Sequence, residues 1–414
     1  MGETTFIATN QAVETVKKQR GFRLRGDVPL FIITLIIIVI GLLMVFSASW
    51  NDVFRNGKSS VLISQLLYIG LGSIVAFTIS LINYHFWRKV AVWMMLLVLI
   101  MLIVTLLIKP DNPGESTRSL YHGRILPSEF AKPIIIIYLS VWLASKREHI
   151  NKITIGLIPL IFILGTTAFL IIAQPDLNQA IMITLIGCIL FFLAGVNMRQ
   201  IILIIILAAA FGTLLLLITG KWTKIEDFFT GTGNIELAND HIKRSFEAIY
   251  RGGLWGVGIG NSTTKFTGLP FPWTDSIFAV IVEETGIAGS IITLGLYLAF
   301  LWRGLTLASH TPDLLGKLLT AGMALWISLE ALANLSVMTG VIPFAGNALP
   351  MMSAGGSSMI SILFGIGILM SVAGFRNENP VSTDGRLFNA AVDLRWRDRR
   401  RRVSRSVSSS RTRR

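Results

Sequence analysis

Charged residues are scarce in this sequence. They make up 14% of its 414 residues, whereas soluble domains contain roughly 25%. Hydrophobic residues make up 53%. This balance excludes an ordinary soluble protein and predicts an integral membrane protein. Cysteine is scarcer still, because Cys188 is the only one. A single cysteine excludes a disulfide within the chain, and we expect Cys188 to pack inside an apolar span.

A helix that spans a bilayer needs about 20 apolar residues, and such stretches recur ten times along the chain. Basic residues cluster before the first stretch and after the last, so the positive-inside rule places both termini in the cytoplasm. The sequence therefore predicts an all-α integral membrane protein with about ten transmembrane helices. The predicted spans lie near residues 29–48, 62–82, 90–108, 129–145, 154–173, 177–195, 200–219, 277–301, 318–338 and 358–375.

The predicted topology divides the chain into three parts. Residues 1–28 form a cytoplasmic N-terminal segment, residues 29–375 a polytopic membrane domain, and residues 376–414 a basic cytoplasmic tail. The tail lacks apolar periodicity, so we expect it to be disordered and to attract anionic lipid rather than nucleic acid. A long extracellular loop, residues 220–276, separates the seventh and eighth spans, and its aromatic residues favour an ordered structure at the membrane interface.

Polar side chains gather in four patches, all at the predicted outer face. The first contains Arg118, followed by Glu129 and Lys132 at the start of the fourth span. Glu129 and Lys132 lie three residues apart on a helix and can pair. This pair is either a structural ion pair or a device that directs Lys132 or Arg118 at an anionic phosphate. The second patch is a polar break at residues 174–176, where a proline excludes a continuous helix.

Asp275 lies in the third patch, where the hydrophilic loop turns into the long apolar eighth span. A carboxylate at a membrane face that water reaches costs little free energy. It can act as a base or bind a cation. Glu284 follows nine residues later, about 13 Å along a helix. We therefore expect Glu283 and Glu284 to be structural or cavity-facing rather than to act on the same atom as Asp275.

The fourth patch, residues 334–358, is rich in glycine, proline and serine and carries no charge. Irregular backbone at membrane depth must be buried in protein or line a wet cavity. The amides around Ser353 and Ser357 are therefore candidates to face a diphosphate or a sugar. A glycine-rich run at residues 251–260 superficially suggests dinucleotide binding, but no βαβ unit surrounds it.

The order and spacing of these patches together resemble the SEDS family (shape, elongation, division and sporulation). The resemblance covers about residues 29–375, and the sequence departs from the family pattern at Ser119, Asn178, Glu330 and Ala354. The matching segments are Pro-Ser-Glu-Phe-Ala-Lys at 127–132, Gln-Pro-Asp-Leu at 174–177, Gly-Gly-Leu-Trp-Gly-Val-Gly-Ile-Gly at 252–260, Thr-Asp-Ser-Ile-Phe-Ala at 274–279, Glu-Glu-Thr-Gly at 283–286 and Ser-Ala-Gly-Gly-Ser-Ser at 353–358.

The resemblance implies a peptidoglycan glycosyltransferase that polymerises lipid II at the outer face of the bacterial cytoplasmic membrane. It also implies a class B penicillin-binding protein and other divisome or elongasome proteins as partners. Asp275 matches the essential acid of the family, and Arg118, Glu129, Lys132 and Gln174 match residues of its cavity. We expect Asp275 to act as general base on an acceptor hydroxyl, with cationic side chains around the leaving diphosphate.

The sequence does not decide whether a metal ion takes part. A divalent cation, Mg²⁺ or Mn²⁺, could bridge Asp275 and the diphosphate, but the sequence lacks the multi-carboxylate cluster that would indicate one. We also expect contact with membrane lipids, because the polyprenyl chains of the substrate would lie between apolar helices at the lipid boundary. The remaining substrate-binding candidates are the basic residues upstream of Asp275 and the serines of the fourth patch: Arg244, Arg251, Lys265, Ser353 and Ser357.

A transporter is the competing class of protein. A lipid II flippase with the same polar cavity would use Asp275 as a proton or cation site. The polar residues crowd one membrane face and the spans lack matched discontinuous helices, which favours the enzyme. A third alternative is an idle scaffold, against which the intact Asp275 argues.

Overall fold

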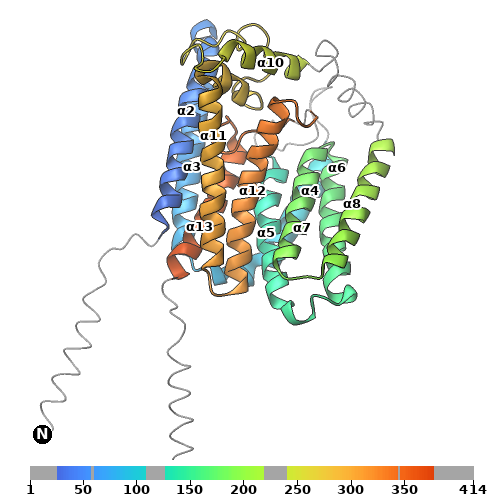
Figure 1. Ribbon diagram of the computed structural model, residues 1–414. Helices are drawn as coiled ribbons and strands as arrows, with labels where there is room; N and C mark the ends of the chain where they lie inside the picture. The colour runs from blue at the N-terminus through green and yellow to red at the C-terminus, as the bar shows by residue number, and fades with distance from the viewer. Residues whose placement is uncertain (1–25, 57–59, 109–125, 219–239, 344–345, 377–414) are drawn as a thin grey trace, which may run out of the picture. The chain divides into compact units, whose positions relative to one another are not determined.

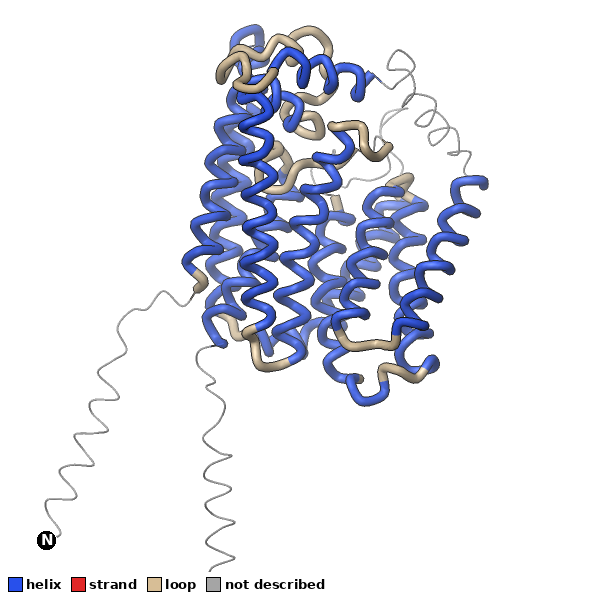
Figure 2. The backbone as a smooth tube through the Cα atoms, in the orientation of Figure 1, coloured by secondary structure: helices blue, strands red, loops and turns tan. Residues whose placement is uncertain are grey.

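The computed structural model describes residues 26–56, 60–108, 126–218, 240–343 and 346–376. Every regular element in these ranges is a helix (Figure 2). The α-helices are α2 (Val28–Asn56), α3 (Ser60–Leu81), α4 (Trp87–Leu107), α5 (Pro127–Ser145), α6 (Ile158–Ala173), α7 (Leu177–Leu193), α8 (Met198–Ile218), α10 (Asp240–Gly252), α11 (Ile277–Ser309), α12 (Leu314–Met338) and α13 (Gly356–Arg376). Two short 3-10 helices, η1 (Tyr84–Phe86) and η2 (Arg147–His149), lie between them, and a short π-helix, η3 (Ile153–Leu157), leads into α6.

Each of the ten predicted spans coincides with an α-helix, so the predicted all-α architecture is confirmed. Among the described residues, eight helices are long and apolar enough to cross a membrane, and two shorter apolar helical stretches accompany them, Leu177–Leu193 and Met198–Ala210. The exact number of spans and the sides on which the termini lie stay predictions. Residues 1–25 and 377–414, which contain most of the predicted N-terminal segment and tail, lie outside the described residues.

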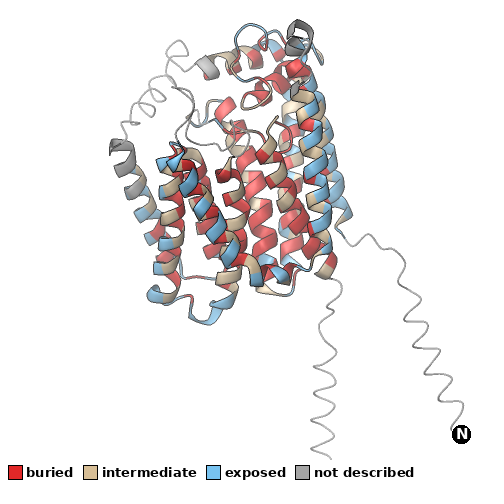
Figure 3. Cartoon of the chain, turned by 180° about the vertical axis from the view of Figure 1, so that it is seen from behind, coloured by how far each residue is buried: buried red, intermediate tan, exposed pale blue. Residues whose placement is uncertain are grey.

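The buried core runs along α5, α12 and α13 (Figure 3). In the most apolar part of each helix, 78% of α12 is buried but only 17% of α3, so α3 lies at the periphery and exposes leucine and isoleucine as a lipid-facing helix does. α11 packs against α12 and α2, and α5 packs against α4, α7 and α12. The amphipathic α10 lies across the end of this bundle, against α11 and α12 (Figure 1).

Gly286 interrupts α11 with a non-helical backbone (φ 69°, ψ −170°). At this kink, backbone groups of residues 283–288 bond to loop residues 253–258 instead of continuing the helical ladder; the Val257 amide, for example, donates to the Glu283 carbonyl at 3.0 Å. A Cβ atom at residue 286 would lie 2.4 Å from a loop carbonyl oxygen. Only glycine permits both the positive φ and this approach. The kink therefore fixes the loop that leads to Asp275.

Candidate active site

Asp275 lies directly before α11, half-buried, between two other segments of the chain. Its carbonyl oxygen accepts a hydrogen bond of 2.9 Å from the Asn334 side chain near the end of α12. Its carboxylate lies against Gly346, where a Cβ atom would approach the Oδ2 atom to 2.8 Å. The acid is therefore held at the meeting point of the α11 start, the α12 end and the α12–α13 connection.

Hydrogen bonds, with one covalent step between neighbouring residues of α7, lead from the backbone carbonyl of Asp275 to the start of α5. Asn334 also donates to the carbonyl oxygen of Asn347, and the side chain of Asn347 accepts from Asn178 on α7. The next residue on α7, Gln179, donates to Glu129 at 2.9 Å. The first, third and fourth patches of the sequence thus belong to one polar network, although they lie far apart in the chain.

Lys132 lies at the end of this network with only 1% of its surface exposed. Its ammonium group lies 2.8 Å from Glu129 and 2.6 Å from Glu330 on α12. The predicted pairing of Glu129 with Lys132 is present. Glu330 was singled out only as a departure from the family pattern, not as a partner of Lys132. A carboxylate inside an apolar span was the signal, since such a group needs a partner.

The fourth patch is a tightly bonded connection between α12 and α13. Ser353 accepts from the Leu349 amide and donates to the Thr274 carbonyl, each at 2.7 Å. Ser357 accepts from the Leu126 amide at 3.1 Å and so ties α13 to the start of α5. Both serines hold backbone in place, Ser353 directly before Asp275 and Ser357 at the start of α5. Their predicted contact with substrate stays a prediction.

Gln174 is fully buried at the end of α6. Its Nε2 atom donates to the Leu102 carbonyl at 2.9 Å and to the Thr105 hydroxyl at 3.2 Å. Asp176 caps the N-terminus of α7, where its side chain accepts a hydrogen bond from the Gln179 amide. The polar break at residues 174–176 therefore joins α6 to α4 and starts α7, while its contact with substrate stays a prediction.

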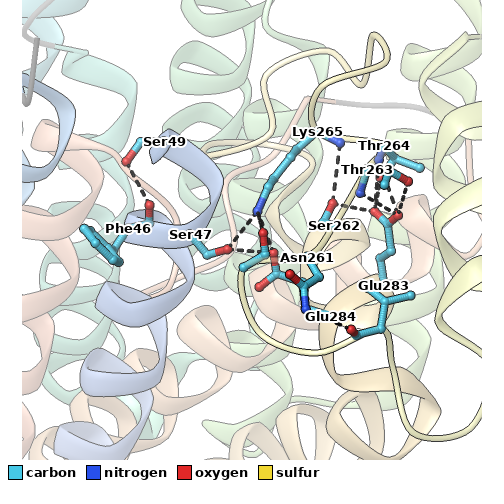
Figure 4. Close-up of polar contacts among 12 residues, drawn as sticks. Phe46, Ser47, Ser49, Asn261, Ser262, Thr263, Thr264, Lys265, Glu283 and Glu284 are labelled. Atoms are coloured by element: carbon cyan, nitrogen blue, oxygen red, sulfur yellow. Dashed lines mark hydrogen bonds and ion pairs between the residues drawn. The ribbon is translucent and has the colours of Figure 1, made fainter. Parts of the chain in front are cut away.

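Lys265 is buried and paired within the protein, and its predicted contact with substrate stays a prediction. Its side chain is 1% exposed, and its ammonium group lies 2.8 Å from Glu284 and 3.0 Å from the Ser47 hydroxyl of α2 (Figure 4). The protein's own oxygens therefore occupy this lysine. Beside it, Glu283 accepts from the hydroxyls and amides of residues 262–264, at 2.5 Å from Ser262 (Figure 4). Both acids have structural contacts, which is one of the two roles expected of them.

Arg244 and Arg251 lie on α10 and share Glu247 as a partner, at 2.8 and 2.9 Å. Their side chains are 39% and 42% exposed, so solvent reaches both guanidinium groups. Arg118 lies outside the described residues. Among the described residues, no group of three or more His, Cys, Asp or Glu side chains could hold a metal ion. A divalent cation at Asp275 would need most of its ligands from phosphate oxygens or water.

Comparisons with known proteins place this geometry in a family. Residues 28–378 match the family model described as cell cycle protein and named for FtsW, RodA and SpoVE. Stage V sporulation protein E of Bacillus subtilis is 32% identical over 354 residues, which cover 84% of this chain and 96% of the relative. The probable peptidoglycan glycosyltransferase FtsW of Coxiella burnetii is 30% identical over 362 residues, 85% of this chain and 97% of the relative.

Solved structures share the fold. A chain from a study of the structural coordination of polymerization and crosslinking by a peptidoglycan synthase complex has a TM-score of 0.68 at 24% identity, covering 85% of this chain and 98% of that chain. The rod shape determining protein RodA of Thermus thermophilus has a TM-score of 0.61 at 23% identity, covering 85% of this chain and 97% of that chain. This protein is therefore a multi-pass membrane protein, and it belongs to the FtsW, RodA and SpoVE family that its sequence resembles.

Proposed function

We propose that this chain is a peptidoglycan glycosyltransferase that polymerises lipid II into β-1,4-linked glycan at the outer face of the bacterial cytoplasmic membrane, in cell division or elongation. Relatives that match nearly their whole length carry the name peptidoglycan glycosyltransferase. The observation that carries the proposal is the polar network itself. It joins the backbone of a half-buried acid, Asp275, to a buried cation, Lys132, through residues of α12, α7 and α5.

In the proposed reaction, Asp275 accepts the proton of the acceptor hydroxyl while the hydroxyl oxygen attacks the anomeric carbon of the donor sugar. The bond between that carbon and the diphosphate oxygen breaks, and undecaprenyl diphosphate leaves with the bonding electrons. One displacement inverts the expected α-linkage of the donor into a β-linkage. The diphosphate linkage is the activated bond, so no nucleotide is needed.

The protein's task is to hold the base in position and to stabilise charge on the leaving group. Asn334 and Gly346 fix Asp275 from two sides, which favours a defined direction of proton transfer. The partly exposed Arg244 and Arg251 would face the diphosphate, and the contact of Lys132 with it stays a prediction, because Glu129 and Glu330 hold its ammonium group. A Mg²⁺ or Mn²⁺ ion bound chiefly by the diphosphate is compatible with these residues.

The proposed partner is a class B penicillin-binding protein, with other divisome or elongasome proteins around it. A solved structure with this fold comes from a peptidoglycan synthase complex whose description joins polymerization to crosslinking. A polymerase that delivers glycan to a crosslinking enzyme is the simplest assembly of this kind.

The test is polymerisation of purified lipid II, with and without a class B penicillin-binding protein. We expect Asp275→Asn to lower the rate by at least about 100-fold, as loss of a general base does. Asp313→Asn is the matched control, because Asp313 caps the start of α12 and asparagine also caps helices. Equal polymer from wild type and Asp275→Asn would refute the assigned role. Transport of lipid II across vesicles without polymer would establish the flippase instead.

A further inference from the structure

Residues 346–348 of the connection between α12 and α13 lie beside Asp275 with little backbone bonding of their own. Among the described residues, no hydrogen bond between backbone groups involves residues 346–348. Such bonds begin at Leu349, whose carbonyl oxygen accepts from the amides of Met352 and Ser353 at 3.2 and 2.9 Å. A segment without backbone bonds opens easily unless other groups fix it. Side chains therefore decide where residues 346–348 lie.

Two asparagine side chains hold this segment at Asn347. The Nδ2 atom of Asn334 on α12 donates to the Asn347 carbonyl oxygen, and it also donates to the Asp275 carbonyl oxygen at 2.9 Å. The Nδ2 atom of Asn178 on α7 donates to the side-chain oxygen of Asn347. Asn347 is 3% exposed, and its own Nδ2 atom is buried without a hydrogen-bond partner among the described residues. The bond from Asn178 is therefore the contact that orients the Asn347 side chain.

Asp275 is sensitive to where this segment lies. Gly346 directly precedes Asn347, and a Cβ atom at residue 346 would come within 2.8 Å of the Asp275 Oδ2 atom. The backbone at Gly346 is thus a surface that the carboxylate contacts. A displaced Asn347 would move this surface and would also strain the bonds that Asn334 makes to the Asn347 and Asp275 carbonyl oxygens. Misplacing a reacting group by about 1 Å can slow a reaction about 100-fold.

The first turn of α7 supports neighbouring segments on two sides. Asn178 reaches Asn347, and the next residue, Gln179, donates to Glu129 on α5 at 2.9 Å. Asp176 caps the same turn by accepting from the Gln179 amide, and α7 packs against both α5 and α12. A capped and packed first turn is a fixed support. Asn178 is also a position at which the sequence departs from the family pattern, so the resemblance does not imply its contact with Asn347.

We propose that Asn178 and Asn347 are positioning residues, which tie residues 346–348 to the first turn of α7 and thereby set the position of the Asp275 carboxylate. This inference rests on the function proposed above, in which Asp275 is the base. Neither asparagine contacts the reacting atoms in this role. Their loss acts through Asp275, so it slows the proton transfer and leaves the affinity for substrate unchanged.

Polymerisation kinetics on purified lipid II test the role. We expect Asn178→Ala and Asn347→Ala each to lower kcat at least about tenfold, with KM within about twofold of wild type. The double variant should be no slower than the slower single variant, because both changes remove the same bond. Asn178→Gln keeps an amide donor and should recover most of the rate. Thr184→Val is the control on α7, because the Thr184 hydroxyl donates to the Ala180 carbonyl of its own helix.

A thiol at residue 275 reports its surroundings without any activity. The probe is a water-soluble maleimide, and the protein is Asp275→Cys with Cys188→Ser, which leaves one cysteine in the chain. Adding Asn178→Ala should raise the labelling rate at least about threefold, because the freed segment uncovers residue 275, while adding Thr184→Val should not change it. If wild type makes no polymer, the function proposed above fails and the labelling still tests the contact. An unchanged labelling rate, multiplied losses of kcat in the double variant, or losses confined to KM would each overturn the positioning role.

Discussion

Two buried lysines of this protein sit in clusters of similar composition but opposite character. Lys265 and Lys132 each lie near two carboxylates on the membrane helices. In the Lys265 cluster, only Glu284 contacts the lysine, while Glu283 is saturated by hydroxyls and amides of the loop. In the Lys132 cluster, both carboxylates share the one ammonium group.

The difference extends to the polar atoms left over. Around Lys132, the second oxygen of Glu330, the side-chain oxygen of Gln179 and the Ser128 hydroxyl are buried without a hydrogen-bond partner among the described residues. In the Lys265 cluster, both carboxylate oxygens of Glu283 accept bonds from the loop, and the second oxygen of Glu284 is the atom left without a hydrogen-bond partner among the described residues. Buried polar groups that are fully paired serve structure, whereas unpaired ones call for an explanation such as a ligand or a bound water. Because more unpaired atoms surround Lys132 than Lys265, and because Glu283 is bonded to the loop through several donors, we regard the Lys265 cluster as a clasp for the loop and the Lys132 cluster as part of the site.

The largest effect is expected from Lys132→Met. Two carboxylates would stay buried without their cation, which typically destabilises a protein by about 3–5 kcal/mol. We expect lower thermal stability in detergent together with loss of polymerisation. The informative control is the triple variant Lys132→Met, Glu129→Gln and Glu330→Gln, in which no charge is left to compensate. Recovered stability without activity would assign the cluster to the substrate, and recovered activity would make the whole cluster structural.

A smaller effect on activity is expected from Lys265→Met. The variant leaves Glu284 buried without its cation, so stability should fall by about 3–5 kcal/mol and proteases should cleave the loop faster. The paired variant Lys265→Met and Glu284→Gln removes both charges and should restore stability and most of the polymerisation rate. If the paired variant is stable but about 100-fold slower, Lys265 contacts the substrate as the sequence suggested and the clasp interpretation is wrong.

The contrast also explains what the sequence could predict. Each span predicted from hydropathy coincides with an α-helix, because a helix in lipid needs a long apolar run wherever it packs. The spacing of Glu129 and Lys132 predicted their pairing, because neighbours on one helix turn meet regardless of tertiary structure. Asp275 was recognisable because a carboxylate at the start of an apolar helix is rare. These features are local, and the structure preserves them.

The contacts that separate the two clusters are not local. Glu330 lies 198 positions from Lys132 in the chain, and Ser47 lies 218 positions from Lys265. No sequence periodicity links such distant residues, so the sequence grouped Lys265 with the other basic residues of the outer loop. The roles of Ser353 and Gln174 as backbone anchors were equally hidden, because a side chain that bonds to a distant carbonyl has no signature in sequence.

The smallest effect on stability is expected from Glu330→Gln, and this variant gives the sharpest comparison between the Lys132 and Lys265 clusters. The glutamine oxygen can still accept from Lys132, and Glu129 remains as the charged partner 2.8 Å away. The variant removes the second carboxylate and with it a desolvation cost, so the free energy of unfolding should change by no more than about 1 kcal/mol. Glu283→Gln is the matched change in the other cluster, and there a glutamine nitrogen faces donors of residues 262–264. That variant should lose about 1–3 kcal/mol. Thermal unfolding of both variants measures the difference, and equal losses would mean that Glu330 is as firmly integrated as Glu283 and that the two clusters do not differ in kind.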